Sequence, residues 1–454
     1  MDTDTIAAIA TPPGRGAVGI IRISGKNALH VIDKIFRKPK KTWQSHKMYY
    51  GYIYTGNKSY DTVVDEVMIC CMLAPRSYTA EDVVEIYTHG GTTTVNSVLE
   101  AATHNGARLA QAGEFTKRAF FSGRINLSQA EAVMDLISAK TNSARQAGLR
   151  QLGGGLSRCI TEARDRLLMW IANIELSIDY PEHEDEAMNK MSILEEGQSW
   201  LNQLEKLLQT ADYGRIISEG IKTAIIGRPN VGKSTLLNTI IGEDRAIVHE
   251  IPGTTRDVLS VQVILGNVML NLMDTAGIRD TSDPIESIGV KKSIKAAHEA
   301  EMILYILDRS KPPNQEDLTI LEELKNKHII TILNKCDLPI ADGWDNVSQK
   351  INHNISAYNR DGLDKLYKHI DESFNKGLIS SDDSDIITRH RHKILLESAI
   401  DNVKCAMDEI MQGIEEDLIS VRLREAYTNL GEILGLEVND DIIDRIFSEF
   451  CVGK

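Results

Sequence analysis

Residues Gly227 to Ser234 read Gly-Arg-Pro-Asn-Val-Gly-Lys-Ser and match the phosphate-loop pattern G-x-x-x-x-G-K-[ST]. Glycines at these positions let backbone N–H groups surround phosphate oxygens, and the positive end of a following helix adds to the attraction. Lys233 would contact the β- and γ-phosphates, and the Ser234 hydroxyl would bind Mg²⁺. The sequence therefore predicts a nucleoside triphosphate site.

Two further motifs supply groups for the metal and the γ-phosphate. Asp274-Thr-Ala-Gly277 follows an apolar segment, so Asp274 can hold Mg²⁺ through water and the Gly277 N–H can contact the γ-phosphate. Gly253-Thr-Thr-Arg-Asp257 lies between this motif and the phosphate loop. One of its threonines can complete the metal shell.

Two more motifs predict guanine as the base. Asn334-Lys-Cys-Asp337 ends an apolar strand, and a carboxylate there accepts hydrogen bonds from guanine N1 and N2, where adenine lacks the same donors. A backbone N–H at Ser356-Ala357 can bind guanine O6. The GTP contacts that these motifs predict are Asn230, Val231, Gly232, Lys233, Ser234, Thr235, Gly253, Thr254, Thr255, Asp274, Thr275, Ala276, Gly277, Asn334, Lys335, Asp337, Ser356 and Ala357.

The group that orients the attacking water is not fixed by these motifs. Ras-type proteins carry a glutamine after D-T-A-G, whereas this chain has Ile278. The nearby carboxylates are Asp280, Asp283 and Glu286, and the nearby arginines are Arg256 and Arg279, each of which also fits a surface role. The Asn230 side chain could hold a monovalent cation or simply stabilise the loop, and both readings stay open.

The elements that must position these motifs divide the chain into four parts. Residues 1–118 read as mixed α/β, with strands expected at 5–10, 19–24, 48–54 and 63–73. Residues 119–215 show helical periodicity, broken at 181–186. Residues 216–380 alternate strands at 222–226, 268–273, 302–307 and 328–333 with helices, which is typical of a parallel sheet. A linker is expected at 380–384, and the fourth part, residues 381–454, shows helical periodicity from Thr388 onward. The simplest organisation is a helical domain interrupted by an inserted nucleotide-binding domain.

Composition sets the outer limits. The chain has 454 residues, a net charge of −14, 42% hydrophobic residues and 26% charged residues, which excludes collagen-like and wholly disordered proteins. Its 6 cysteines are too few for a disulfide framework and lack zinc spacing. The N-terminus is acidic, unlike a secretory signal, and no apolar run approaches the ~20 residues of a membrane span. We therefore expect a cytoplasmic protein without membrane contact.

Several other segments, taken with the GTP motifs, resemble the tRNA-modification GTPase family called MnmE or TrmE along the whole chain. They are Thr11-Pro-Pro-Gly-Arg-Gly16, Ile20-Ile-Arg-Ile-Ser-Gly25, Ser77-Tyr-Thr-Ala-Glu-Asp82, His89-Gly-Gly91, Gly113-Glu-Phe-Thr-Lys-Arg-Ala-Phe120, Asn126-Leu-Ser-Gln-Ala-Glu-Ala132 and the terminal Cys451-Val-Gly-Lys454. The resemblance implies an N-terminal α+β domain like the tetrahydrofolate-binding part of folate enzymes, which also dimerises the protein. It further implies a helical domain and an inserted Ras-like P-loop GTPase domain.

The resemblance also implies a reaction. Such proteins work with an FAD protein of the MnmG type, in a heterotetramer, to add a carboxymethylaminomethyl or aminomethyl group to C5 of the wobble uridine of certain tRNAs. The one-carbon unit is thought to come from 5-formyl- or 5,10-methylene-tetrahydrofolate, whose contacts map to Arg22, Glu81, Arg124 and Lys454. The family often has lysine at the position of Arg124, and Ala80 and Ala112 replace its usual glycine and proline.

In the GTPase part, the family uses a K⁺ ion that accelerates hydrolysis when two G domains meet. Its ligands map to Asn230, His249, Ile251 and Thr254, so the implied GTP contacts include His249, Glu250, Ile251 and Pro252. The Mg²⁺ ligands map to Ser234 and Thr255, and the residue that positions the water maps to Glu286. Cys451 is a candidate nucleophile for uridine C6, although a structural or dispensable tail cysteine is an alternative.

Two other functions compete with a tRNA-modifying GTPase. A GTP-regulated, RNA-binding ribosome-assembly factor would share the GTP motifs, but such proteins usually carry an RNA-binding module, and after residue 380 we find only the basic patch Arg389-His-Arg-His-Lys393. A stand-alone folate enzyme with a regulatory GTPase would form product without a partner.

Overall fold

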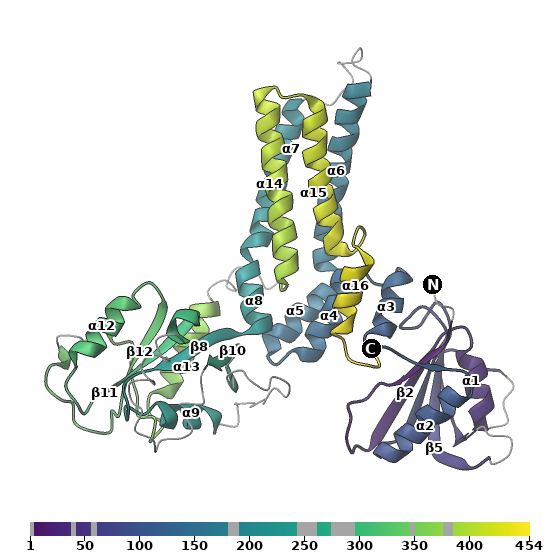
Figure 1. Ribbon diagram of the computed structural model, residues 1–454, viewed down its shortest axis with the longest axis horizontal. Coiled ribbons are helices and arrows are strands. Elements are labelled where there is room, and N and C mark those ends of the chain that lie inside the picture. Colours follow the sequence, from purple (N-terminus) through teal and green to yellow (C-terminus); the bar gives the residue numbers. More distant parts are fainter. Residues whose placement is uncertain are drawn as a thin grey trace. The chain divides into compact units, whose positions relative to one another are not determined.

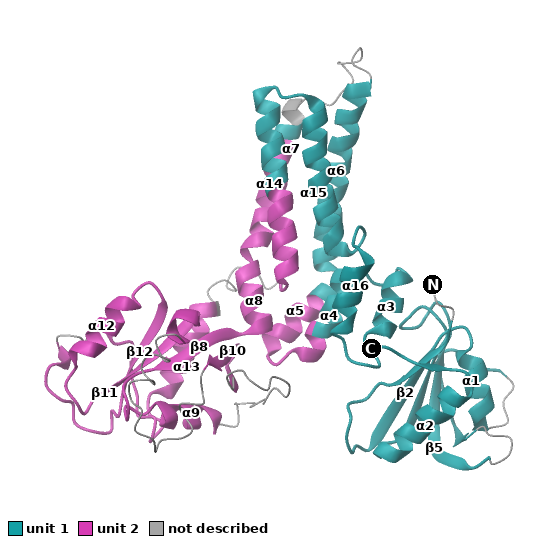
Figure 2. Ribbon diagram, viewed as in Figure 1, with its two compact units in different colours: residues 1–134, 151–194, 401–454 teal, residues 135–150, 195–400 magenta. Residues whose placement is uncertain are grey.

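The computed structural model describes residues 4–37, 42–55, 61–179, 190–242, 261–273, 296–345, 350–375 and 385–454 (Figure 1). The chain divides into two compact units (Figure 2). Met1–Met134, Gln151–Leu194 and Asp401–Lys454 form the first unit, and Asp135–Arg150 and Glu195–Ile400 form the second. Each unit therefore joins segments that are far apart in the sequence.

The first unit contains a seven-stranded sheet in the order β3-β4-β5-β6-β2-β1-β7. Its strands are β1 (Ile6–Ile9), β2 (Val18–Ser24), β3 (Phe36–Arg37), β4 (Lys47–Tyr54), β5 (Val63–Met72), β6 (Val83–His89) and β7 (Arg108–Leu109). Neighbouring strands are antiparallel except for β1 and β7, which pair in parallel. The strands predicted at 5–10, 19–24, 48–54 and 63–73 are confirmed, and each predicted end lies within one residue of the observed end.

Helices α1 (Ala28–Ile35) and α2 (Thr92–His104) pack on this sheet (Figure 1). The core between them contains alternate strand residues such as Ile21, Ile23 and Ile69, each with no exposed surface. Because successive strand residues point to opposite faces, the residues between them lie on the other face of the sheet. Arg22 is one of these residues.

The remaining helices of the first half of the chain confirm the predicted helical region. They are α3 (Glu114–Phe121), α4 (Leu127–Ser138), α5 (Asn142–Leu152), α6 (Gly155–Asp179), α7 (Lys190–Gln209) and α8 (Ala211–Glu219). After the second sheet come α14 (His390–Gln412), α15 (Glu416–Leu434) and α16 (Asp440–Ser448). The Arg164 side chain joins α6 to α15. It donates to the Tyr427 carbonyl, and its guanidinium lies 3.9 Å from the centre of the Tyr427 ring.

The second unit contains a six-stranded sheet in the order β13-β12-β11-β8-β10-β9. Its strands are β8 (Ile221–Ile226), β9 (Val261–Leu265), β10 (Val268–Met273), β11 (Met302–Asp308), β12 (His328–Asn334) and β13 (His353–Asn354). The four strands predicted in this region are confirmed as β8, β10, β11 and β12. The predicted parallel pairing is confirmed among β8, β10, β11, β12 and β13, while the edge strand β9, which was not predicted, runs antiparallel to β10. The two strands are joined by a tight turn at Gly266, whose φ of 62° suits glycine.

Helices cover this sheet on both faces, which is the layer structure of an α/β domain. One core includes residues of α9 (Lys233–Ile241) and α13 (Leu363–Asn375), and the other includes residues next to α12 (Gln315–Glu323). Every residue of β11 is buried, and alternate residues enter the two cores. This explains the uninterrupted apolar run in the sequence.

None of the helices in the described part of the chain has the length and apolar character needed to cross a bilayer. Nor do the described residues bring together three histidine, cysteine or acidic side chains that could hold a metal ion.

The chain enters and leaves the α/β domain at one place. Thr210, just before α8, accepts a hydrogen bond from the Ile387 N–H at 3.1 Å, and Ser218 donates to the Thr388 carbonyl at 3.2 Å. Gly214 lies so close that a Cβ there would be 2.0 Å from the Ile387 oxygen. Adjacent entry and exit segments are what an inserted domain requires. The predicted linker at 380–384 and the predicted break at 181–186 lie outside the described residues, and the predicted domain boundaries at 118, 215 and 380 remain predictions.

Gly214→Ala is expected to destabilise the second unit, although alanine ordinarily favours a helix. The backbone would have to move away from Ile387, at a cost of about 1–3 kcal/mol. Thermal unfolding followed by circular dichroism should show a lower midpoint. Ser218→Ala, which loses only one hydrogen bond worth about 1 kcal/mol, is the graded control. An unchanged midpoint for Gly214→Ala would contradict the close approach.

Candidate functional site

The predicted phosphate loop connects β8 to α9, as its pattern requires. Gly227 and Gly232 have φ values of 150° and 103°, a region that favours glycine. A Cβ at Gly227 would lie 2.3 Å from the Ile306 oxygen, and one at Gly232 would lie 2.2 Å from the Asn334 amide nitrogen. The loop thus lies directly against β11 and the end of β12, and no larger residue fits at either position.

Lys233 is the first residue of α9, and its ammonium group lies inside the loop. It donates to the carbonyls of Gly227 at 2.8 Å and Arg228 at 2.7 Å. Burial lowers the pKa of Lys233. A phosphate oxygen would offer this partly desolvated cation a charged acceptor in place of neutral carbonyls, so the arrangement favours an anion. Ser234 and Thr235 follow in the first turn of the helix, where Ser234 was predicted to bind Mg²⁺.

The Asn334 side chain joins the phosphate loop to the predicted guanine loops. It is 2% exposed, donates to the Val231 carbonyl at 2.8 Å and accepts from the Ala357 N–H at 2.9 Å. The Lys335 ammonium donates to the Asn230 carbonyl at 3.0 Å. Three motifs that are far apart in the sequence therefore form one constellation.

Asp337 and Ser356 complete this side of the site. Asp337 is exposed at the surface beside Asn334, so its carboxylate is accessible to a base. Ser356 has no exposed surface and accepts from the Asn359 N–H at 3.1 Å, which shapes the loop that carries the Ala357 N–H. The arrangement can present the two carboxylate oxygens of Asp337 to a purine edge, whereas the Ala357 N–H expected to bind guanine O6 donates here to the Asn334 side chain.

Asp308 is a buried site residue that the sequence analysis missed. It ends β11 and contacts the Lys335 ammonium at 2.7 Å. Burial alone would raise the pKa of Asp308, but the hydrogen bonds from Lys335 and Ser310 outweigh it, and the net shift is downward. A single aspartate at the end of an apolar strand is the only sequence signal for this role.

The other predicted nucleotide ligands lie outside the described residues. They are His249, Glu250, Ile251, Pro252, Gly253, Thr254, Thr255, Asp274, Thr275, Ala276, Gly277 and Glu286. The roles proposed for them in binding K⁺, Mg²⁺ and water remain predictions.

The second predicted site lies in the first unit, on β2 and the segments beside it. Arg22 contacts the Glu85 carboxylate at 2.9 Å and donates to the Gly453 carbonyl at 3.1 Å. Its guanidinium also lies 5.4 Å from the Tyr78 ring centre and 5.7 Å from that of Phe115. Glu85, Tyr78 and Phe115 were not singled out from the sequence, although the last two belong to motifs quoted there.

Glu81 and Arg124, the other predicted folate contacts, lie in the same unit. Glu81 accepts from the Ser24 hydroxyl at 2.7 Å and contacts Arg118 at 3.2 Å. Arg124 donates to the Tyr78 carbonyl at 2.7 Å and lies 5.1 Å from its ring centre. Two guanidinium groups thus flank one aromatic ring, a geometry that favours a planar or anionic ligand.

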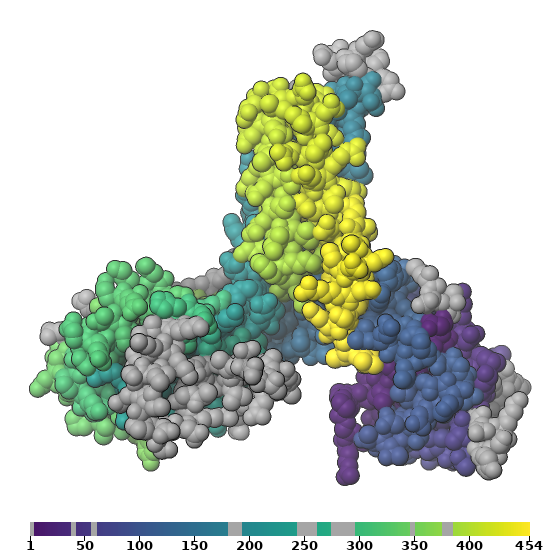
Figure 3. Space-filling view, viewed as in Figure 1, coloured from purple at the N-terminus to yellow at the C-terminus, as the bar shows by residue number. Residues whose placement is uncertain are grey.

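The C-terminal segment completes this cluster. Val452 pairs with Ala112 in an antiparallel bridge, and a Cβ at Gly453 would lie 2.3 Å from the Ile9 oxygen. In Figure 3 the yellow C-terminal residues lie against blue residues of the helices that follow the N-terminal sheet. Burial, and then the charge of Arg22, lower the pKa of Lys454, which places its ammonium in this cluster. Cys451 is exposed.

Among the residues that depart from the family pattern, which are Ala80, Ala112 and Arg124, Ala80 has an unusual backbone. Its φ of 63° is left-handed, a conformation that costs a non-glycine residue roughly 1–2 kcal/mol. The family's glycine would adopt this conformation freely, so Ala80 keeps the loop shape before Glu81 at a cost in conformational energy.

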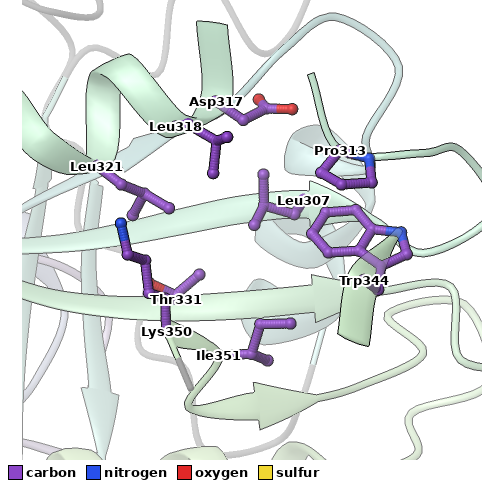
Figure 4. A pocket seen from close by; sticks show the side chains of 9 residues that line it. All are labelled: Leu307, Pro313, Asp317, Leu318, Leu321, Thr331, Trp344, Lys350 and Ile351. Atoms are coloured by element: carbon purple, nitrogen blue, oxygen red, sulfur yellow. The ribbon is translucent and has the colours of Figure 1, made fainter. Parts of the chain in front are cut away.

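A small hollow lies elsewhere in the second unit, and Figure 4 shows its lining. Leu307, Leu318, Leu321 and Trp344 face it, and none of the predicted ligand contacts takes part. It is an apolar gap between α12 and the sheet.

Two protein-family models match the chain and together span nearly all of it. One is described as "MnmE helical domain" and matches residues 127–451, and the other is "GTP-binding protein TrmE N-terminus" and matches residues 5–124.

Curated proteins resemble the chain over its full length. One from Finegoldia magna, named "tRNA modification GTPase MnmE", is 44% identical over 457 residues, covering 99% of this chain and 100% of the relative. Another of the same name, from Bacillus subtilis, is 43% identical over 460 residues, with coverage of 99% and 100%.

Two solved structures each resemble part of the chain. Aquifex aeolicus Era bound to GDP and aluminium fluoride is 26% identical and has a TM-score of 0.26, covering 40% of this chain and 66% of its own. The G domain of the T. maritima FeoB iron transporter is 22% identical and also has a TM-score of 0.26, with coverage of 34% and 97%.

Asp337→Asn is expected to weaken GTP binding by at least about a hundredfold, because an amide cannot accept both guanine N–H groups. A xanthine nucleotide, whose C2 carbonyl can accept from the new amide, should bind the variant better than it binds the parent protein. Titration calorimetry measures both affinities. Asp342→Asn, an exposed carboxylate in the same segment, is the matched control. Unchanged GTP affinity in Asp337→Asn would exclude this residue as the guanine contact.

Proposed function

This chain belongs to the MnmE family of tRNA modification GTPases, and from that premise we propose that it is a K⁺-stimulated GTP hydrolase that modifies wobble uridine. Working with an MnmG-type FAD protein, it would add a carboxymethylaminomethyl or aminomethyl group to C5 of uridine 34 in certain tRNAs. The observation that carries the proposal is the presence on one chain of two separate constellations, one fitted to a guanine nucleotide and one rich in cations and aromatic rings.

GTP hydrolysis with Mg²⁺ is the family's activity, and the finer assignment concerns K⁺. The Asn230 carbonyl is fixed by Lys335 at 3.0 Å, while Asn230 itself is exposed beside the phosphate loop. A fixed backbone with an accessible amide suits a cation ligand. We assign K⁺ to Asn230, His249, Ile251 and Thr254, Mg²⁺ to Ser234 and Thr255, and the positioning of the attacking water to Glu286. Lys233 neutralises charge on the phosphates.

The cluster around Tyr78 supports a folate site. Arg22, Arg124 and Lys454 supply positive charge, Tyr78 and Phe115 supply aromatic faces, and Glu81 supplies an acceptor. A tetrahydrofolate has a planar ring with N–H groups and an anionic tail, so these residues fit it. When bound, 5-formyl- or 5,10-methylene-tetrahydrofolate would supply the one-carbon unit. The residues of this chain would bind and orient it, and Cys451 stays a candidate nucleophile.

A homodimer is supported by the sheet face opposite α1 and α2. Tyr50 on β4 and Met68 on β5 pair across the strands and are 54% and 45% exposed. Met48 and Tyr52 add further exposed apolar surface on β4. Contiguous patches of this kind mark interaction surfaces. We propose that a second copy of the chain covers this face, and that the dimer binds MnmG in a heterotetramer and acts on tRNA in the cytoplasm.

The alternative of an RNA-binding assembly factor gains no support from the basic patch. Arg389 forms an ion pair with Asp135, and Lys393 contacts Asp212 at 2.8 Å. These ion pairs neutralise much of the positive charge of the patch, so little charge remains to bind a phosphate backbone.

Hydrolysis is expected to be faster in KCl than in NaCl, and Glu286→Ala should lower the rate in KCl by about a hundredfold or more. The reason is that a lost water-positioning carboxylate cannot be replaced by solvent. Asp283→Ala, a neighbouring carboxylate without that role, is the matched control.

Mass spectrometry of tRNA from a deletion strain should show unmodified wobble uridine. Equal rates in both salts with an active Glu286→Ala protein would refute the mechanism, and normal wobble uridine would refute the reaction.

Arg22→Gln is expected to raise the dissociation constant for 5-formyl-tetrahydrofolate about tenfold, because one charge-assisted contact is lost. Calorimetry with the full-length protein measures it, and GTP affinity should stay the same. Lys26→Gln removes an exposed charge just after the same strand and serves as the control. Unchanged folate affinity in Arg22→Gln would place the folate elsewhere.

A further inference from the structure

Arg228, the second residue of the phosphate loop, has a partner that no motif predicts. One of its Nη atoms lies 2.8 Å from a carboxylate oxygen of Asp317, in the first turn of α12. The Asp317 side chain is only 2% exposed. A buried carboxylate requires a positive partner, since an unpaired charge in the interior is strongly unfavourable. Arg228 therefore directs its charge to α12 and not to a phosphate.

The other bonds of Asp317 hold it in a fixed position. One carboxylate oxygen accepts from the Tyr305 hydroxyl at 2.9 Å, and the other accepts from the Asn314 N–H at 3.2 Å in the capping box of α12. Tyr305 is 1% exposed on β11. Both oxygens of Asp317 are thus bonded to rigid elements, and Arg228 is attached to a fixed point.

The role of this attachment follows from the other bonds of the loop. Asn334 holds the Val231 carbonyl and Lys335 holds the Asn230 carbonyl. The first half of the loop is held from inside by Lys233, at the carbonyls of Gly227 and Arg228. The Lys233 ammonium has three donors, and those that turn to phosphate oxygens are no longer available to these carbonyls. The Arg228–Asp317 pair then remains to hold this half of the loop.

We propose that Asp317 is a positioning residue for nucleotide binding, which acts through Arg228 to keep the first half of the phosphate loop in its binding shape. The pair contributes to the lifetime of the bound nucleotide and not to the chemical step. Because it touches no reacting atom, its loss should change affinity and dissociation while leaving the rate of hydrolysis in the saturated protein nearly unchanged.

Asp317→Asn in the full-length protein tests this inference. We expect a fluorescent GDP analogue to dissociate about tenfold faster, because a loop without this attachment is no longer preorganised to hold the phosphates. Single-turnover hydrolysis at saturating GTP should change by less than about twofold. Arg228→Gln, which leaves the bonds from Tyr305 and Asn314 to Asp317 intact, should give the same acceleration even if Asp317→Asn folds poorly.

The remaining variants separate positioning from stability. The double variant Arg228→Gln with Asp317→Asn should dissociate GDP no faster than either single variant, because both remove the same contact. Arg228→Lys should restore part of the lifetime. Glu322→Gln, an exposed carboxylate on the same helix paired with Lys325, is the matched control and should change nothing. A lower unfolding midpoint with an unchanged GDP lifetime in Asp317→Asn and Arg228→Gln would overturn the inference.

The inference rests on the GTPase activity and not on the tRNA chemistry. If the parent protein failed to bind GDP, the proposed function would fail. If it bound GDP and these variants bound it equally long, the positioning role alone would fail.

Discussion

A phosphate loop must leave its N–H groups available to the nucleotide, so its shape has to be held through its carbonyls and its side chains. This constraint explains the polar contacts made by the carbonyl groups of the loop. The carbonyls of Gly227, Arg228, Asn230 and Val231 all accept hydrogen bonds from the side chains of Lys233, Lys335 and Asn334. Two of these donors also belong to the guanine motif. Base recognition and phosphate recognition therefore share one set of hydrogen bonds, which is why the two motifs occur together.

The N-terminal site depends on a similar fixation, provided here by the end of the chain. Arg22 is bonded to Glu85 on the neighbouring strand and to the carbonyl of Gly453. Glu85 is itself bonded to the Tyr87 hydroxyl at 2.8 Å, where burial and the carboxylate raise the pKa of Tyr87 to about 12. The tyrosine thus stays a hydrogen-bond donor over the whole physiological range. Both charged partners of the cluster are oriented before a ligand arrives, so little ordering cost remains on binding.

The sequence predicts the elements well wherever their pattern is simple. The apolar run of β11 and the β-rich segments of β4 and β5 appear at the expected residues, and so does the strand–loop–helix around Lys233. It does not predict contacts that depend on one polar residue at the end of an element. Asp308 and Asp317 look like ordinary surface carboxylates in the sequence, and only the fold buries them beside Lys335 and Arg228. The antiparallel edge strand β9 was also missed, because its partner is decided by a two-residue turn.

The strands β9 and β10, which adjoin the predicted nucleotide-binding loops, are hydrogen-bonded to a helical segment of the same unit. Lys140, between α4 and α5, bonds to the Gln262 side chain on β9. Gln262 donates to Asn271 on β10 at 2.9 Å, and Asn271 donates to the Glu219 carbonyl at the end of α8 at 2.7 Å. Partial burial lowers the pKa of Lys140. A shift of β9 or β10 must therefore either carry these bonds with it or break them. The position of the strands that lead into the nucleotide-binding loops therefore affects the helices next to the sheet.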